Sequence, residues 1–197
     1  MLLKNKSAVI YGAGGAIGQR LAPSFDECHR SSASVRFDGR INQSNQEESH
    51  MADILHKVGI KSSSLDDAYK ALTTLEGLSG WWTNNTQGES KVGGVIQFRF
   101  GAHGIDMKVL ELYPAKRVLW QVVDGPEEWI GTKVSWELKQ EGDWTIVLFK
   151  HEGWKEPVEF MHHCSTKWGV FLLSLKSLLE TGKGAPAPND IKIDNWN

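Results

Sequence analysis

The longest amphipathic pattern of the chain lies between Pro157 and Gly182. Apolar residues recur there at steps of three and four, the spacing that lines one face of an α-helix, at Val158, Met161, Cys164, Trp168, Phe171, Leu172, Leu175, Leu178 and Leu179. Pro157 suits the first helical turn, and Gly182 and Gly184 end the pattern. The sequence therefore predicts one long helix on which a sheet can close.

Short alternating patterns precede this helix and predict antiparallel strands. One covers residues 53–62, and five or six more follow Gly93, separated by turns rich in glycine, proline and charged residues. The alternating positions that share a face are Ile54, His56, Val58 and Ile60; Ile96, Phe98 and Phe100; Ile105, Met107 and Val109; Val118, Trp120 and Val122; Thr132, Val134, Trp136 and Leu138; and Thr145, Val147, Phe149 and His151. Over residues 132–139 the intervening positions are polar, so one face of the sheet should be packed and the other solvated.

Two short helices are predicted between the first strand and residue 93. Ser64 is a typical N-cap before acidic residues, and the apolar face of the first helix is Leu65, Ala68, Leu72 and Leu75. The helix is expected to break at Gly77 and Gly80. The order β, α, α, five or six β, α predicts an α+β fold in which a curved antiparallel sheet wraps around the long C-terminal helix.

The first 50 residues differ from the rest of the chain. Residues 7–11 form a short β-pattern, a glycine-rich turn follows at 12–18, and Pro23 interrupts the helix-like stretch that comes next. Residues 5–22 resemble the opening of the short-chain dehydrogenase/reductase family. No tyrosine of the chain is followed four residues later by the lysine that this family needs for catalysis. We therefore expect a truncated remnant over 1–24 that binds no NAD(H) or NADP(H), a disordered linker over 25–50 and one domain over 51–197.

Composition limits the partners of the protein. The chain has 197 residues, 40% of them hydrophobic and 23% charged, with a net charge of -2, so it has no basic excess for nucleic acid. Cys28 and Cys164 stand in unlike contexts, which indicates neither a disulfide framework nor a metal site. No stretch is long and apolar enough for a membrane span, and the first residues do not resemble a secretory signal, which together indicate a cytoplasmic protein.

Several short motifs occur in a characteristic order. They are Gly80-Trp81-Trp82-Thr83, Gly93-Gly94, Leu112-Tyr113-Pro114 to Leu119-Trp120, Phe149-Lys150-His151-Glu152-Gly153-Trp154, and Trp168-Gly169 to Leu178-Leu179-Glu180-Thr181-Gly182-Lys183-Gly184. With the order of the elements, they resemble the helix-grip superfamily of START-like and Bet v 1-like (SRPBCC) domains over residues 51–193. Within it they are similar to the branch related to the C-terminal domain of the activator of the Hsp90 ATPase. The resemblance implies a cavity between sheet and helix that holds an apolar ligand.

The aromatic residues on the apolar faces are the main candidates for a binding site. All nine tryptophans lie beyond residue 80, and such rings can either fill a core or line a cavity. Because the fold resembled is hollow, we expect the ligand to contact Trp81, Phe98, Phe100, Met107, Trp120, Trp136, Phe149, His151, Trp168 and Phe171.

Other chemistry has weaker candidates. His151 ends an apolar strand face and is either a hydrogen-bonded wall residue or an acid/base group. His162 and His163 are adjacent on the helix and therefore make a poor metal pair. Cys164 has no evident activating base and is expected to be a core residue.

Three functions follow from these observations. We expect the binding of a small apolar or aromatic ligand, without catalysis, cofactor or metal. The alternatives are a co-chaperone-like domain that binds a protein partner, and an enzyme of the cyclase or hydratase type that uses His151.

Overall fold

A computed structural model describes residues 52–196, and the structural statements below concern this part of the chain. The predicted remnant over 1–24 and the predicted linker over 25–50 lie outside the described residues. Within 52–196 the elements are β1 Ala52–Lys61, α1 Leu65–Thr73, α2 Leu75–Trp81, β2 Asn85–Gly88, β3 Val95–Phe100, β4 His103–Tyr113, β5 Arg117–Asp124, β6 Lys133–Glu141, β7 Trp144–Trp154 and α3 Glu159–Thr181.

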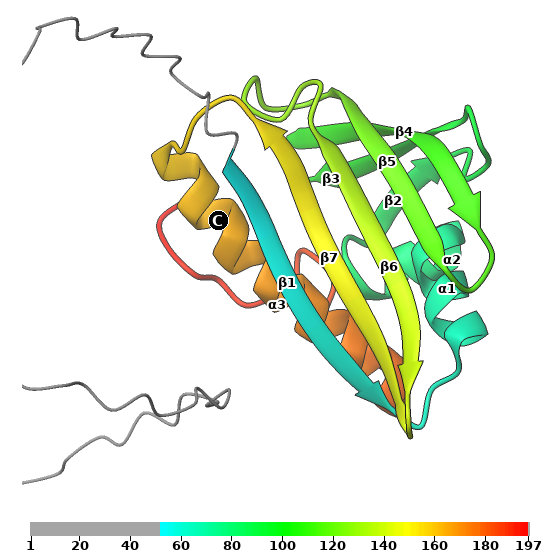
Figure 1. Ribbon diagram of the computed structural model, residues 1–197. Helices are drawn as coiled ribbons and strands as arrows, with labels where there is room; N and C mark the ends of the chain where they lie inside the picture. Colours follow the sequence, from blue (N-terminus) through cyan, green and yellow to red (C-terminus); the bar gives the residue numbers. More distant parts are fainter. Residues whose placement is uncertain (1–51, 197) are drawn as a thin grey trace, which may run out of the picture. The chain divides into compact units, whose positions relative to one another are not determined.

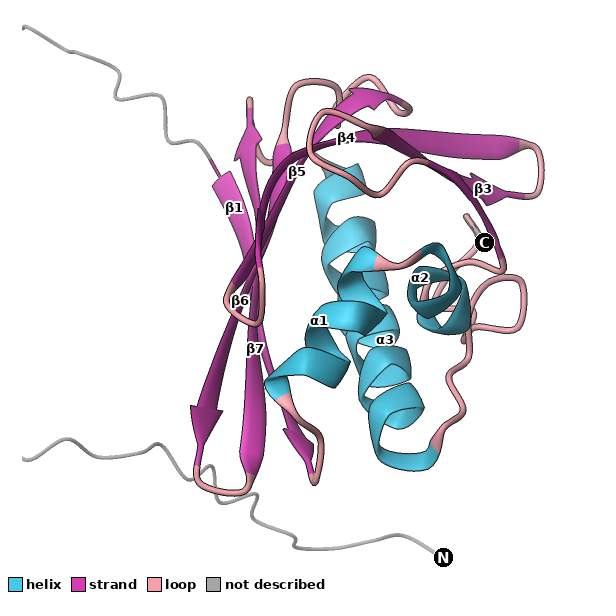
Figure 2. Ribbon diagram, turned by 90° about the vertical axis from the view of Figure 1, so that its right-hand side faces the viewer, coloured by secondary structure: helices cyan, strands magenta, loops and turns pink. Residues whose placement is uncertain are grey.

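The strands of the described region form one seven-stranded sheet in the order β1-β7-β6-β5-β4-β3-β2. Every pair of neighbours is antiparallel. Figure 1 shows α3 running across one face of this sheet, and Figure 2 shows the sheet bending around α3 with α1 and α2 on the same concave side. The predicted α+β fold, a curved antiparallel sheet wrapped around a C-terminal helix, is confirmed.

The first helix begins at the predicted cap. The Ser64 hydroxyl accepts a hydrogen bond from the Asp67 N–H, and the Asp67 side chain accepts one from the Ser64 N–H, so two helix-end donors are satisfied. The predicted break at Gly77 and Gly80 is wrong. The chain breaks at Thr74, whose side chain caps α2 by accepting from the Gly77 N–H.

Gly77 instead allows the two short helices to meet. A Cβ atom at this position would lie 2.6 Å from the Cα of Ala71. Since real side chains do not approach backbone so closely, glycine is needed for the contact between α1 and α2.

The long helix matches its predicted span, with a difference at its start. Val158 is the N-cap and α3 begins at Glu159, so Pro157 precedes the helix instead of sitting in its first turn. Gly182 ends it in the left-handed conformation, with a φ of 77°, which glycine adopts without strain. Among residues 52–196 no helix has both the length and the apolarity to cross a bilayer.

Aromatic rings fill the space between the sheet and the middle of α3. Six of them are at most 2% exposed, namely Trp82, Phe98, Trp120, Trp136, Phe149 and Trp168. The ring centroids of Trp82 and Phe98 lie 4.1 Å apart, and those of Phe149 and Trp168 lie 4.6 Å apart. Helix and sheet therefore touch through stacked and tilted rings, and burial of each ring contributes on the order of 2 kcal/mol to folding.

Two parts of the fold were not predicted. The short edge strand β2 has no alternating apolar pattern, since its sequence is NTQG. The connection between β5 and β6 is not a tight turn at Gly125 and Pro126 but a longer loop, and it carries Trp129 into the core, where that side chain is 6% exposed.

Candidate ligand-binding cleft

A cleft of about 1320 Å³ opens at the N-terminal half of α3. Its walls are α3, the β3–β4 turn, the β5–β6 loop and the C-terminal segment, defined here as residues 182–196. The apolar lining consists of Trp82, Phe100, Ile105, Trp129, Phe160, Trp168, Phe171 and Trp196. The connection from α2 to β2 adds Trp82 to these walls, so five segments far apart in sequence enclose an aromatic surface.

Three of the ten predicted contact residues line this cleft: Phe100, Trp168 and Phe171. The other seven lie in the packed core, each at most 2% exposed, and are Trp81, Phe98, Met107, Trp120, Trp136, Phe149 and His151. Strand periodicity identifies the face of the sheet on which a residue lies. It does not distinguish positions in the middle of a strand, where rings pack against each other, from positions at the end of a strand, where a cleft can open.

His151 is held by the structure as a neutral, fully bonded residue. Its side chain is 0% exposed, its Nδ1 accepts from the indole N–H of Trp168 at 3.2 Å, and its Nε2 lies 2.9 Å from the Thr132 hydroxyl. That hydroxyl donates its proton to the Trp129 carbonyl at 2.5 Å, so the His151 Nε2–H is the donor in the pair with Thr132. Burial lowers the pKa of His151 from 6.5 to about 3. With both ring nitrogens engaged, His151 is a structural hydrogen-bonding residue.

Cys164 lies on the cleft side of α3 and is 3% exposed. The Trp129 indole N–H donates to its sulfur at 3.3 Å. Burial raises the pKa of this thiol to about 12. Because the thiolate is the reactive form, Cys164 is a core residue that anchors the β5–β6 loop, as its sequence context predicts.

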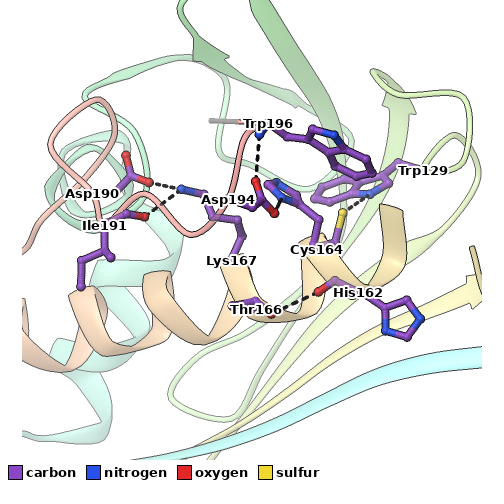
Figure 3. A network of polar contacts seen from close by, with 10 residues as sticks. Trp129, His162, Cys164, Thr166, Lys167, Asp190, Ile191, Asp194 and Trp196 are labelled. Atoms are coloured by element: carbon purple, nitrogen blue, oxygen red, sulfur yellow. Dashed lines mark hydrogen bonds and ion pairs between the residues drawn. The ribbon is translucent and has the colours of Figure 1, made fainter. Parts of the chain in front are cut away.

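Two polar pairs join α3 to the C-terminal segment. The His163 Nδ1 lies 2.7 Å from the Asp194 carboxylate, and the Lys167 ammonium donates to the Asp190 carboxylate. Figure 3 shows Asp194 and the pair of Lys167 and Asp190 on one side of the helix, with His162 on the far side of α3 from Asp194. The hydrogen bond from His163 holds the pKa of Asp194 below its usual value. The pairs fix the C-terminal segment as a wall of the cleft.

The imidazole of His163 is also enclosed by aromatic rings. The Phe160 ring stacks on it at a centroid distance of 6.0 Å, and the Trp196 ring lies 5.4 Å away. Its Nδ1 makes the bond to Asp194, and no described residue forms a hydrogen bond with its Nε2. The His163 side chain is 13% exposed and lines the cleft.

The opposite rim of the cleft carries a further ion pair. Arg99 on β3 contacts Asp106 on β4 at 2.5 Å, and the Asp106 side chain is only 16% exposed. Asp106 is therefore paired and half-buried. No group of three or more His, Cys, Asp and Glu side chains in the described region is arranged to hold a metal ion.

Sequence reasoning missed most of the polar lining. His163 and Lys167 are four residues apart on α3, which places them on one helix face, and Asp190 and Asp194 have the same spacing in the C-terminal segment. The helical spacing indicated that His163 and Lys167 share a face, but nothing in the sequence indicated which residues they pair with. Trp129 and Phe160 had no signal, because neither belongs to the alternating strand pattern or to the apolar set that defined the helix.

Comparisons with known proteins agree on one family. Residues 62–180 match the family model described as Activator of Hsp90 ATPase homolog 1-like protein. The solution structure of the Aha1 dimer from Colwellia psychrerythraea is similar, with 48% sequence identity and a TM-score of 0.63, over 68% of this chain and 100% of that chain. No curated protein matches.

More distant structures share the fold. CalU16 from Micromonospora echinospora has 17% identity and a TM-score of 0.57, over 70% of this chain and 78% of its own. A conserved protein of unknown function from Enterococcus faecalis has 21% identity and a TM-score of 0.58, over 75% of this chain and 80% of its own. At such identities the likeness concerns the fold alone.

Proposed function

The chain belongs to the Activator of Hsp90 ATPase homolog 1-like family, and from that premise we propose that it binds a small apolar or aromatic molecule in the cleft beside α3. The observation that carries this proposal is a volume of about 1320 Å³ walled by aromatic side chains. Ligand pockets usually measure about 300–1,000 Å³ and are lined mainly by apolar groups. A molecule of several fused rings would fit with room for water.

The ligand chemistry follows from the lining. Trp168, Phe171 and Phe100 present ring surfaces, which favour flat apolar or aromatic groups through buried area and stacking. Two cationic side chains of the lining, Arg99 and Lys167, are already paired with Asp106 and Asp190, so an anionic ligand would have to break an ion pair to bind to either of them. A neutral ligand with one or two polar atoms suits this site best.

Tryptophan fluorescence tests the proposal. The full chain would be titrated with fatty acids, flavonoids and polycyclic dyes, and quenching should saturate for the planar aromatic compounds. Phe171→Ala should weaken that binding by about 1–3 kcal/mol through lost ring contact. Leu173→Ala is the matched control on the same helix, since Leu173 is 61% exposed and does not line the cleft. No saturable binding across the panel would refute the proposal.

A second candidate is binding of an Hsp90-type ATPase. It is favoured by the 48% identity to the Aha1 chain, all of which this chain covers. Calorimetric titration of purified Hsp90 into the protein, with the ATPase rate measured in parallel, tests it. Absence of both heat and rate change would exclude it. The third possibility, an enzyme that uses His151, gains no support, since both nitrogens of that ring are engaged.

A further inference from the structure

The cleft contains a histidine that is set up differently from His151. His163 is oriented through Nδ1 by the Asp194 carboxylate at 2.7 Å, and its ring is enclosed by Phe160 and Trp196. A carboxylate that accepts from Nδ1–H fixes the tautomer in which Nε2 carries a lone pair, and it stabilises the imidazolium formed when Nε2 takes up a proton. We propose that His163, positioned by Asp194, is a general base for a planar aromatic carbon acid bound in the cleft.

The proposal rests on the proposed function, because the substrate must first occupy the cleft. Nε2 has no hydrogen-bonding partner among the described residues, so its lone pair is free for a ligand. Lys167 lies one helical turn away, about 6 Å along the axis, and also lines the cleft. Its ammonium group is paired with the Asp190 carboxylate, so it adds no net charge beside the ligand.

The reaction class is proton transfer, because the cleft offers no activated nucleophile near His163. The neighbouring Cys164 is kept protonated by burial and its sulfur is bonded by Trp129. In the step, Nε2 takes the proton from a C–H bond of the ligand, and the electron pair of that bond moves into an adjacent carbonyl to give an enolate. The imidazolium then returns the proton to carbon at the same or another position. The net change is an exchange or an isomerisation, which needs no further reactant.

Other charged and titratable groups face the same space and contribute to the charge around His163. From the C-terminal segment they are Asp190, Lys192 and Asp194; from α3 they are Lys167 and Cys164; across the cleft they are Arg99, His103 and Asp124. Lys167 and Arg99 are neutralised by Asp190 and Asp106, respectively. Asp194 is the carboxylate bonded to His163, so its removal should affect the base most directly.

A nitrobenzisoxazole is a suitable probe. It is a planar aromatic carbon acid, and removal of its ring C–H proton forms the nitrile as the N–O bond breaks, with the oxygen leaving as a coloured phenolate. The full chain should accelerate this ring opening, and His163→Gln should slow it by at least about tenfold. His162→Gln is the matched control and should leave the rate unchanged, since His162 is exposed, lies on the other side of α3 and does not line the cleft.

Asp194→Asn tests the positioning role separately. Without the carboxylate, the Nδ1–H of His163 loses its charged acceptor, so the rate of ring opening should fall while binding of a flat ligand is retained. An equal loss of ligand binding would show that Asp194 serves only the fold and would overturn its assignment. Binding of a nitrobenzotriazole, which is flat but lacks the carbon acid, is measured in all variants by tryptophan quenching.

The two proposals fail in different ways. If the triazole binds but the parent opens the probe no faster than His163→Gln does, the base assignment is wrong and ligand binding stands. If neither compound binds the parent, both proposals fall for planar aromatic ligands. The expected result is that the triazole binds both the parent and His163→Gln, with a modest loss of affinity in the variant that lacks the Nε2 acceptor for the triazole N–H, and that the rate is lost only in the variant.

Discussion

Acid should destabilise this protein through His151 before most of its carboxylates are protonated. Burial holds the pKa of His151 near 3 in the folded state, against 6.5 for an ordinary histidine. Below about pH 6.5 the unfolded chain therefore binds a proton at His151 that the folded chain does not bind. The contribution of neutral His151 to the free energy of unfolding is complete above that pH and is lost as the pH falls toward 3. Each pH unit in this window costs about 1.4 kcal/mol.

The magnitude is large enough to measure. Between about pH 6.5 and pH 4.5 the parent should lose about 2 kcal/mol of unfolding free energy through His151 alone. His151→Gln removes the titration while retaining an amide N–H for Thr132 and an amide oxygen for the Trp168 indole. Its own stability at neutral pH should be lower, because a buried ring is replaced by a smaller group. Its stability should nevertheless depend less on pH over the same interval.

Urea unfolding of the parent and His151→Gln at several pH values gives the comparison. Carboxylates with lowered pKa values, such as Glu141 and Glu180, also lose their contribution on acidification, but they are identical in both proteins and cancel in the difference. His162→Gln should behave as the parent. If the parent and His151→Gln lost the same free energy between about pH 6.5 and 4.5, the neutral buried state of His151 would be refuted.

Two more predictions concern packing and domain limits. Gly77→Ala should lower the free energy of unfolding by about 1–3 kcal/mol, because its Cβ would lie 2.6 Å from the Ala71 Cα. Gly169→Ala, with nothing within 4 Å of the new Cβ, should be neutral or stabilise α3 by up to about 1 kcal/mol. Equal urea midpoints for the two variants would contradict this prediction. A chain that begins at Met51 should unfold at the same temperature as the full chain, because the sheet and helices pack within residues 52–196, and a large drop in calorimetry would mean that the first 50 residues support this domain.

The fold could be read from the sequence because its signals are local and consistent. The alternating pattern that ends at Phe149 and His151 fixes which face of the strand is apolar, and only one strand register turns that face toward the helix. The capping pair of Ser64 and Asp67 is likewise encoded within four residues. Gly77 was misread because a glycine ends a helix in one context and permits a close helix contact in another, and only the position of Ala71 decides between them.

The cleft was less readable because it is made where elements end. Phe100, at the end of β3, and Trp129, in the β5–β6 loop, reach the cleft by routes that depend on the lengths of loops. Periodicity identifies the inner face of the sheet, and most inner positions are used to fill the core. The sequence therefore correctly identified an aromatic interior but could not locate the part of it that remains open.

The pairs that His163 and Lys167 form with the C-terminal segment could not be predicted from sequence spacing. His163 and Lys167 are separated by about 6 Å of helix, while four extended residues such as those from Asp190 to Asp194 can span about 13 Å. Equal spacing in sequence therefore does not predict two pairs. The segment is brought into place upstream, where the Ala187 N–H donates to the Trp82 carbonyl at 2.9 Å and the Ala187 carbonyl accepts from the Asn84 N–H at 3.1 Å.

The alignment of Asp194 with His163 depends on how the start of the C-terminal segment is anchored to α2. A Cβ at Gly184 would lie 2.2 Å from the Gly80 carbonyl oxygen, so any side chain there must move the C-terminal segment away from α2. Asp194 is ten residues further along and would lose its alignment with His163, and Trp196, which lies in the same segment, would move with it. The position of the carboxylate thus depends on a backbone contact between α2 and the segment after α3, and the geometry of the proposed base is a property of that contact as much as of the two side chains.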